Sequence, residues 1–217
     1  QHPFKGEQLM RSDLDIINDW IQEGSRVLDL GCGTGGFTLA MSPVCKKVIA
    51  VDIVEEFIAE TNKIVKANGL KNTKVVLQSG DKIPISGKSC DAVVLVDVLH
   101  HVEDLNVLLF EIERVLRPGG KLLIYEPNKL NPLMFFFHLF DRNEWGLLRL
   151  GSPQIYKNLL QTRFQVEVLE FSGLVIGPSS IFFSKIAEIL NQKHLYCLFG
   201  WLLPKIFIFS TLKNKNE

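Results

Sequence analysis

Short runs of apolar residues alternate along the chain with longer segments in which apolar residues recur every three or four positions. Residues 27–30, 47–52 and 91–97 form apolar runs that contain or end in an aspartate. Residues 54–68 and 104–116 instead have the spacing of amphipathic helices. Continuous apolar strands that alternate with such helices predict an α/β fold with a parallel sheet covered on both faces.

Further strands are predicted at residues 73–78 and 121–126, and the pattern changes after Glu126. Residues 165–172 and 205–212 read as two late strands separated by a long excursion, which predicts an antiparallel pair at one sheet edge. We therefore expect a single domain over residues 1–217, with residues 26–126 as its cofactor-binding core and residues 127–217 supplying acceptor-side insertions and edge strands.

The segment between the first strand and the following helix is rich in glycine. Gly31, Gly33 and Gly36 allow a close backbone approach, and a helix start presents outward N–H groups to a ligand. The same spacing fits the dinucleotide fingerprint, so an NAD(P)-dependent oxidoreductase stays open. Asp29 precedes the first glycine, and its carboxylate disfavours a pyrophosphate and favours a ligand with a cationic end.

Polar residues follow four of the predicted strands. They are Asp29 to Gly31, Asp52, Gly80 with Asp81, and Asp97 with His100 and His101. A single acid at a strand end is commonly a helix N-cap. Since ligands bind beyond the carboxyl ends of parallel strands, four such ends beside one glycine loop predict a single site.

Composition narrows the classes of partner. The chain has 24 basic and 24 acidic residues, which gives no footprint for nucleic acid. A hydrophobic content of 47% with 15 Phe favours an apolar substrate or surface. The four cysteines include no C-x-x-C pair, so neither a zinc site nor a disulfide framework is predicted. We expect reduced thiols in a cytoplasmic protein. Residues 195–209 are too short and too broken to span a bilayer, although peripheral membrane contact stays open.

Several motifs resemble the class I S-adenosylmethionine-dependent methyltransferases, in the branch with a UbiE-like or type-11 core domain. They are VLDLGCGTGGFT, AVDIVEEF, the Gly80-Asp81 pair, DAVVLVDVLHHVED and RVLRPGGKLLIYEP, within residues 26–126. The resemblance implies a three-layer Rossmann-like fold whose mostly parallel seven-stranded sheet has an antiparallel last strand. It also implies S-adenosylmethionine as cofactor, S-adenosylhomocysteine as product and a small-molecule methyl acceptor.

The resemblance also implies which residues bind the cofactor. The methionine end of the cofactor would lie against the glycine loop, and the acid after the second strand would bind the ribose hydroxyls. The adenine would lie between the ends of the second and third strands. The end of the fourth strand would close the pocket beneath the sulfonium. The corresponding residues are Asp29, Gly31, Cys32, Gly33 and Gly35, then Asp52 and Ile53, then Gly80, Asp81 and Lys82, then Asp97 and Val98.

Methyl transfer requires a general base only if the acceptor must lose a proton early. His100 and His101 are the nearest candidates for that base or for positioning the acceptor, with capping or packing as the alternative; His138 is more distant. No metal site is predicted, because Asp97, Glu126 and His101 lack the usual ligand spacing.

The acceptor pocket is expected at residues 125–150, with 173–201 as a lid. The Phe-rich run 135–140 favours an apolar or amphipathic acceptor, and ordinary core packing is the alternative for it. A subunit that binds S-adenosylmethionine without catalysis is the remaining alternative.

Overall fold

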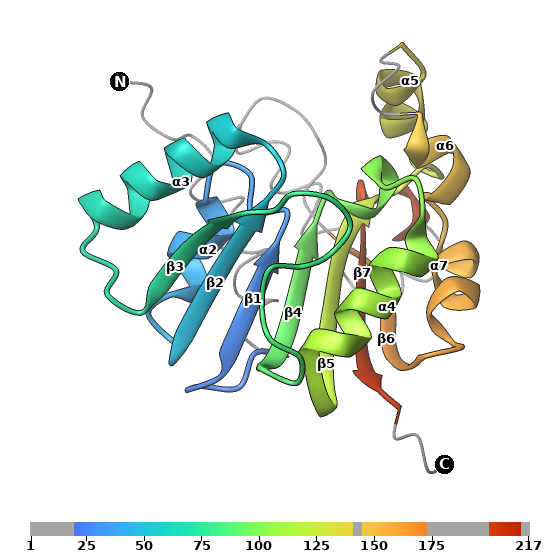
Figure 1. Cartoon of the computed structure of the whole chain (residues 1–217). Helices are drawn as coiled ribbons and strands as arrows, with labels where there is room; N and C mark the ends of the chain where they lie inside the picture. Colours follow the sequence, from blue (N-terminus) through green and yellow to red (C-terminus); the bar gives the residue numbers. More distant parts are fainter. Residues whose placement is uncertain (1–19, 141–144, 173–199, 214–217) are drawn as a thin grey trace.

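The computed structural model describes residues 20–140, 145–172 and 200–213 (Figure 1). Nearly all of the predicted lid lies outside these residues. The described elements, in chain order, are β1 (Arg26–Leu30), α2 (Gly36–Met41), β2 (Lys47–Asp52), α3 (Glu55–Ala67), β3 (Thr73–Leu77), β4 (Cys90–Val96), η1 (Leu99–His101), α4 (Leu105–Val115), β5 (Leu116–Pro127), α5 (Pro132–Phe140), α6 (Gly146–Leu150), α7 (Pro153–Leu160), β6 (Phe164–Ser172), η3 (Gly200–Leu202) and β7 (Lys205–Leu212).

One seven-stranded sheet organises the molecule, in the order β3-β2-β1-β4-β5-β7-β6. The first five strands pair in parallel, whereas β7 is antiparallel to both β5 and β6. The predicted fold class, with its antiparallel last strand, is confirmed. The two late strands do form the edge pair that their alternating pattern predicted.

Each face of the sheet carries its own apolar core because neighbouring side chains on a strand point to opposite faces. On β1, Leu28 joins the cluster under α4 and α7, whereas Val27 joins the cluster that contains Met41 of α2. Figure 1 shows α4 and α7 in front of the sheet and α2 behind it. This is the three-layer arrangement that the uninterrupted apolar strands predicted.

The fifth strand begins earlier than predicted. Leu116 already pairs with Cys90, and the next registered pair is Ala92 with Lys121. Four residues of β5 therefore stand against one residue of β4, and Gly119 has a positive φ of 69° within this irregularity. The Pro-Gly-Gly sequence of residues 118–120 therefore lies in a bulge of β5 and not between a helix and a strand.

The carboxyl ends of β1 to β5 lie at one edge of the sheet, where η1, α5 and α6 also lie (Figure 1). No helix among the described residues has the length and apolar character needed to cross a membrane. The predicted strand-end residues are therefore gathered at a single edge.

Candidate cofactor and acceptor site

The glycine loop after β1 is held between two neighbouring elements. Gly31, Gly33 and Gly35 have φ values of 77°, 52° and 86°, which favour glycine. A Cβ on Gly31 would lie 2.4 Å from Val98 Cγ2, and one on Gly35 would lie 2.9 Å from Thr61 Oγ1. The loop therefore packs tightly against the end of β4 on one side and against α3 on the other.

Two buried carboxylates lie beneath this loop. Asp52 accepts hydrogen bonds from the N–H groups of Gly33 (2.9 Å) and Val54 (3.0 Å). Asp29 accepts one from the Thr38 hydroxyl. The pKa of Asp29 is raised to about 6: burial raises it most, the Thr38 hydrogen bond partly opposes this, and the negative charge of Asp52 adds to the increase. The structure thus brings together the two acids that the sequence placed at the ends of different strands.

Cys32 lies in the same loop as a neutral thiol. Its Sγ is 3.9 Å from Thr61 Oγ1, and burial, with the charges of Asp29 and Asp52 adding to it, raises the thiol pKa to about 12. Cys32, Cys45 and Cys90 are free and buried. Cys197 lies outside the described residues.

The segment after β3 reaches the same edge but makes fewer contacts with the loop. Gln78 donates its backbone N–H to Asp52 O (2.8 Å) and its side-chain amide to Gly80 O (2.9 Å). Asp81 and Lys82 are exposed, and Ile53 is 70% exposed. Within the described residues, Asp81, Lys82 and Ile53 form no hydrogen bond with the Asp52 carboxylate, whose partners are the N–H groups of Gly33 and Val54.

The end of β4 carries an ion pair that the sequence did not predict. Asp97 has a positive φ of 55° and forms an ion pair with Lys205, the first residue of β7. Lys205 Nζ also lies 5.4 Å from the centre of the Tyr125 ring. The sequence analysis missed Lys205, because only the antiparallel placement of β7 beside β5 brings its start to this edge. Val98 packs against the loop from the side, where a Cβ on Gly31 would meet it.

A second acidic residue, Glu126, lies at the end of β5 and is completely buried. Its Oε1 accepts the N–H groups of Val98 (2.7 Å) and Leu99 (2.8 Å), and its Oε2 lies 2.7 Å from His100 Nδ1. His100 is buried, whereas His101 is exposed with its ring 4.0 Å from that of His100. The sequence analysis considered Glu126 only as a metal ligand, although it is an acid at a strand end like the others.

Helix α6 covers the histidine segment. A Cβ on Gly146 would lie only 1.5 Å from His100 O, so the two backbones are in direct contact. Arg149 donates to Val102 O (2.8 Å) from the same helix. No group of three His, Cys, Asp or Glu side chains within the described part of the chain has the arrangement of a metal site.

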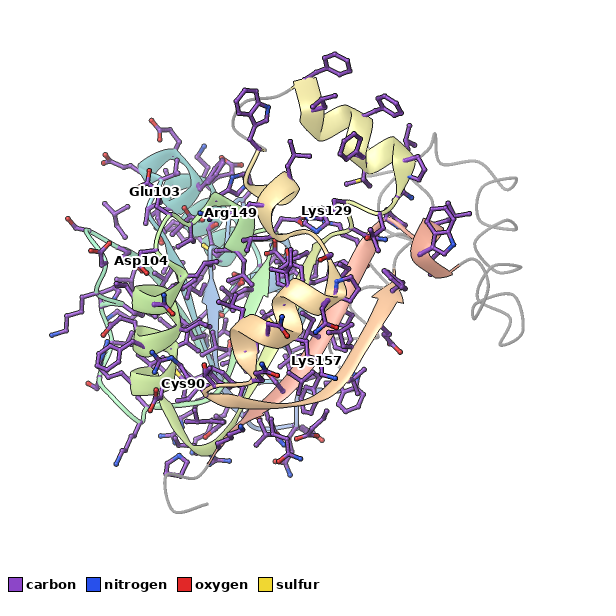
Figure 2. All side chains as sticks on the ribbon, turned by 90° about the vertical axis from the view of Figure 1, so that its right-hand side faces the viewer. Cys90, Glu103, Asp104, Lys129, Arg149 and Lys157 are labelled. Atoms are coloured by element: carbon purple, nitrogen blue, oxygen red, sulfur yellow. The ribbon has the colours of Figure 1, made fainter. Side chains whose placement is uncertain are left out.

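The apolar residues of α5 and its flanks are largely on the surface. Figure 2 shows aromatic side chains projecting away from α5, beyond Lys129 and Arg149. The exposed members of this set, called here the α5 aromatic face, are Leu133, Phe135, Phe136, Leu139 and Phe140 on α5, with Leu130 and Trp145 beside it. Phe136 is 58% exposed and Phe140 is 83% exposed. Core packing, the alternative considered for the Phe-rich run, does not describe these side chains. The side chain of His138, on the same helix, lies outside the described part of the structure.

The buried carboxylate of Asp29 bears on which ligand the loop suits, whereas an acid in the position of Asp52 is also found in dinucleotide-binding enzymes. A diphosphate would face two carboxylates that already repel one another, and no lysine or arginine among the described residues forms an ion pair with either acid. A ligand with a sulfonium and an ammonium group is attracted by the same charges. A hollow at the opposite edge of the sheet, lined by Arg26, Lys47 and Lys74 among others, includes none of the predicted site residues.

Comparison with known proteins agrees with this chemistry. A model of the family described as "Methyltransferase domain" matches residues 28–124. The chain is 32% identical over 161 residues to a demethylmenaquinone methyltransferase of Geobacillus stearothermophilus, covering 70% of this chain and 67% of that protein. It is 33% identical over 167 residues to a ubiquinone biosynthesis O-methyltransferase of Xanthomonas oryzae pv. oryzae, covering 71% and 68%.

The fold has solved counterparts. A SAM-dependent methyltransferase from Aquifex aeolicus superimposes with a TM-score of 0.69 at 19% identity, covering 97% of this chain and 94% of that one. At this identity the likeness concerns the fold alone. Taken with the two sequence relatives and the matched domain, it completes the assignment: the chain belongs to the class I S-adenosylmethionine-dependent methyltransferases, and S-adenosylmethionine is its cofactor.

Proposed function

We propose that the protein transfers a methyl group from S-adenosylmethionine to a small apolar acceptor that resembles a quinone precursor. The observation that carries this proposal is the α5 aromatic face, because it follows directly after the strand that ends in Glu126. An acceptor with a hydrocarbon tail would bury part of this face while its reactive ring reaches the strand ends. The names of two relatives, which refer to demethylmenaquinone and ubiquinone biosynthesis, support the same class of acceptor.

The cofactor residues keep the roles that the resemblance implies. Asp52 accepts the two ribose hydroxyls, since a carboxylate is an acceptor only and has room for both. Asp29 attracts the cationic methionine end beside Gly31, Cys32, Gly33 and Gly35. Ile53 packs on the adenine, Gly80, Asp81 and Lys82 border it, and Val98 closes the pocket below the sulfonium together with Asp97.

The cofactor supplies a methyl carbon that is already electrophilic, so the chain contributes mainly alignment and exclusion of water. For a hydroxyl acceptor, His100 is the proton acceptor and His101 positions the ring from the exposed side. The contact of Val98 with Gly31 places this histidine segment next to the cofactor loop. Contact of the α5 aromatic face with a membrane surface, and a cytoplasmic location, stay predictions.

Calorimetric titration with S-adenosylmethionine, S-adenosylhomocysteine and NAD tests the cofactor site. We expect both sulfur compounds to bind and NAD not to bind. Asp52→Ala should weaken S-adenosylmethionine by about 100-fold, since each hydrogen bond to a charged group contributes about 1.5–3 kcal/mol. Glu56→Ala, an exposed acid on the neighbouring helix α3, is the control and should bind normally. Binding of NAD in place of S-adenosylmethionine would overturn the proposal.

The acceptor class is tested with pairs of phenols that share one head group and differ in an isoprenoid tail. The Phe136→Ser/Phe140→Ser variant should raise KM for the tailed acceptor by about 10-fold, the loss expected when roughly 50 Å² of apolar contact area is removed. KM for the short phenol should not change. Phe110→Ser removes a phenylalanine of α4 that is 56% exposed and serves as the control. Turnover of polar acceptors alone would exclude an apolar acceptor.

A further inference from the structure

Lys205, the first residue of β7, places a positive charge at the edge of the sheet where the predicted cofactor residues lie. Its ammonium group forms an ion pair with the Asp97 carboxylate and lies 5.4 Å from the centre of the Tyr125 ring. The side chain of Lys205 is 21% exposed, and that of Asp97 is 44% exposed. The pair is therefore partly sheltered from water and salt, which screen a buried charge less than a surface charge.

The start of β7 is fixed at this edge by the end of β5. Lys205 pairs with Pro127 across the two strands, and β7 begins at the edge that carries α5 (Figure 1). The completely buried Asn128 donates its side-chain amide to Trp201 O and to Leu203 O, at 2.8 Å each. The start of β7 is thereby tied to the segment that leads into the α5 aromatic face, while the Lys205 side chain contacts the end of β4.

The described contacts of Lys205 leave it able to bind a further anion. An ammonium group has three N–H donors and no acceptor. Within the residues that the structure describes, the hydrogen-bond partner of Nζ is one oxygen of Asp97, and the Tyr125 ring adds a cation–π contact. Hydrogen bonds from a charged donor to an anionic oxygen are about twice as strong as those between neutral groups. An anionic oxygen is thus the ligand that suits the remaining donors best.

The expected place of the cofactor adds a second positive charge beside Asp97. The next residue, Val98, packs against the glycine loop, since a Cβ on Gly31 would lie 2.4 Å from its side chain. The family resemblance places the sulfonium at this end of β4, so a single carboxylate would face both the sulfonium and Lys205. Two cations beside one anion leave an excess of positive charge, which an anionic oxygen on the acceptor would offset.

We propose that Lys205 is a specificity-determining residue that binds an anionic oxygen on the head group of the methyl acceptor. This inference rests on the proposed function and makes it more specific, because the acceptor is then amphipathic. Its apolar tail lies toward the α5 aromatic face, and its negative charge lies at Lys205. A carboxylate substituent and an ionised hydroxyl present the same charge to the ammonium group, and the experiment distinguishes the two sources.

Calorimetric titration of the protein saturated with sinefungin tests the inference. Sinefungin is an analogue of S-adenosylmethionine that carries an amine in place of the sulfonium and cannot donate a methyl group. The probes are 4-hydroxybenzoate, pentafluorophenol, which is ionised at neutral pH, and uncharged phenol. At least one anion should bind about 10-fold more tightly than phenol, the lower end of what a hydrogen bond to a charged group contributes. The anion that does so identifies the oxygen, and equal affinities for all three probes would overturn the inference.

Substitutions of Lys205 assign the preference to its charge. Lys205→Met should abolish the preference for the anion, whereas Lys205→Arg should retain most of it. Lys121→Met is the matched control and should leave every affinity unchanged. Lys121 Nζ lies 3.4 Å from Glu167 and 5.1 Å from the centre of the Phe209 ring, so it has the same kinds of partner toward the other end of β7. A preference that persists in Lys205→Met would exclude Lys205 as its source.

The affinity for sinefungin separates this inference from the proposed function. Lys205→Met should bind sinefungin at least as tightly as the native protein does, since a neighbouring cation has been removed. Failure of the native protein to bind sinefungin would refute the proposed function, and this inference with it. If Lys205→Met does not fold, the preference of the native protein for the anion and its retention in Lys205→Arg still decide the outcome.

Discussion

Gly31→Ala is expected to destabilise the protein by about 4 kcal/mol and to abolish binding of S-adenosylmethionine. Alanine at a left-handed position such as the φ of 77° found here costs about 1–2 kcal/mol. The new Cβ would also lie 2.4 Å from Val98 Cγ2, and overpacking of a tight contact costs about 1–3 kcal/mol. To relieve the clash, the loop would have to move away from the end of β4. Because the methionine end of the cofactor is expected against this loop, the movement would disrupt cofactor binding.

Two further variants separate the causes of that loss. Gly24 has the same φ of 77°, but its added Cβ would meet nothing within 4 Å, so Gly24→Ala carries the backbone strain alone. Val98→Ala in combination with Gly31→Ala removes the colliding methyl groups and should restore part of the stability. Urea unfolding of the four proteins, including the native one, measures both effects. Equal losses for Gly24→Ala and Gly31→Ala would show that the contact with Val98 does not constrain the loop.

Asp29→Asn is expected to stabilise the folded protein at neutral pH by about 3 kcal/mol while weakening its affinity for the cofactor. The pKa of Asp29 is raised from 3.8 to about 6, and each pKa unit corresponds to about 1.4 kcal/mol. A raised pKa means that the protonated acid favours the folded state, so its contribution is fully present below about pH 4 and is lost as the pH rises through 6. The amide has no charge to desolvate, and its oxygen can still accept from the Thr38 hydroxyl.

The pH dependence is the decisive readout for this variant. The stability difference between Asp29→Asn and the native protein should be near zero at pH 4 and should grow until about pH 7. Glu103→Gln removes one charge from an exposed position and should produce no such growth. A constant difference across this range would mean that Asp29 does not titrate as described, and unchanged affinity for S-adenosylmethionine would remove Asp29 from the cofactor site.

Local sequence determined the elements of this protein with good precision. The strand predicted at residues 47–52 is β2 at the same bounds, and the strand predicted at 205–212 is β7. The helix predicted at 54–68 is α3 to within one residue at each end. These elements could be predicted because the signal is contained in neighbouring residues, as apolar runs, helical spacing and, after α3, the glycine at position 69. The bulge in β5 was not predicted, since it depends on the register with β4.

The motifs also determined the chemical family, because the strand-end acids and the glycine loop occur in a characteristic order along the chain. The pairing of side chains within the site was decided only by the tertiary structure. Asp97 meets Lys205 because β7 inserts between β5 and β6, and 108 positions separate these two residues in the chain. Glu126 meets His100 because β5 lies beside β4.

The tertiary structure also decided which apolar side chains are buried and which are exposed. The Phe-rich run of α5 has the composition of a core segment, and nothing in its spacing distinguishes a covered helix from an exposed one. Its exposure follows from where α5 leaves the sheet, at the edge beyond β5 and away from the two apolar cores. The sequence by itself thus determined the strands, the helices and the cofactor loop. Strand order and packing decided which charges lie close together, because pair interactions in a sheet depend on neighbours that are distant along the chain.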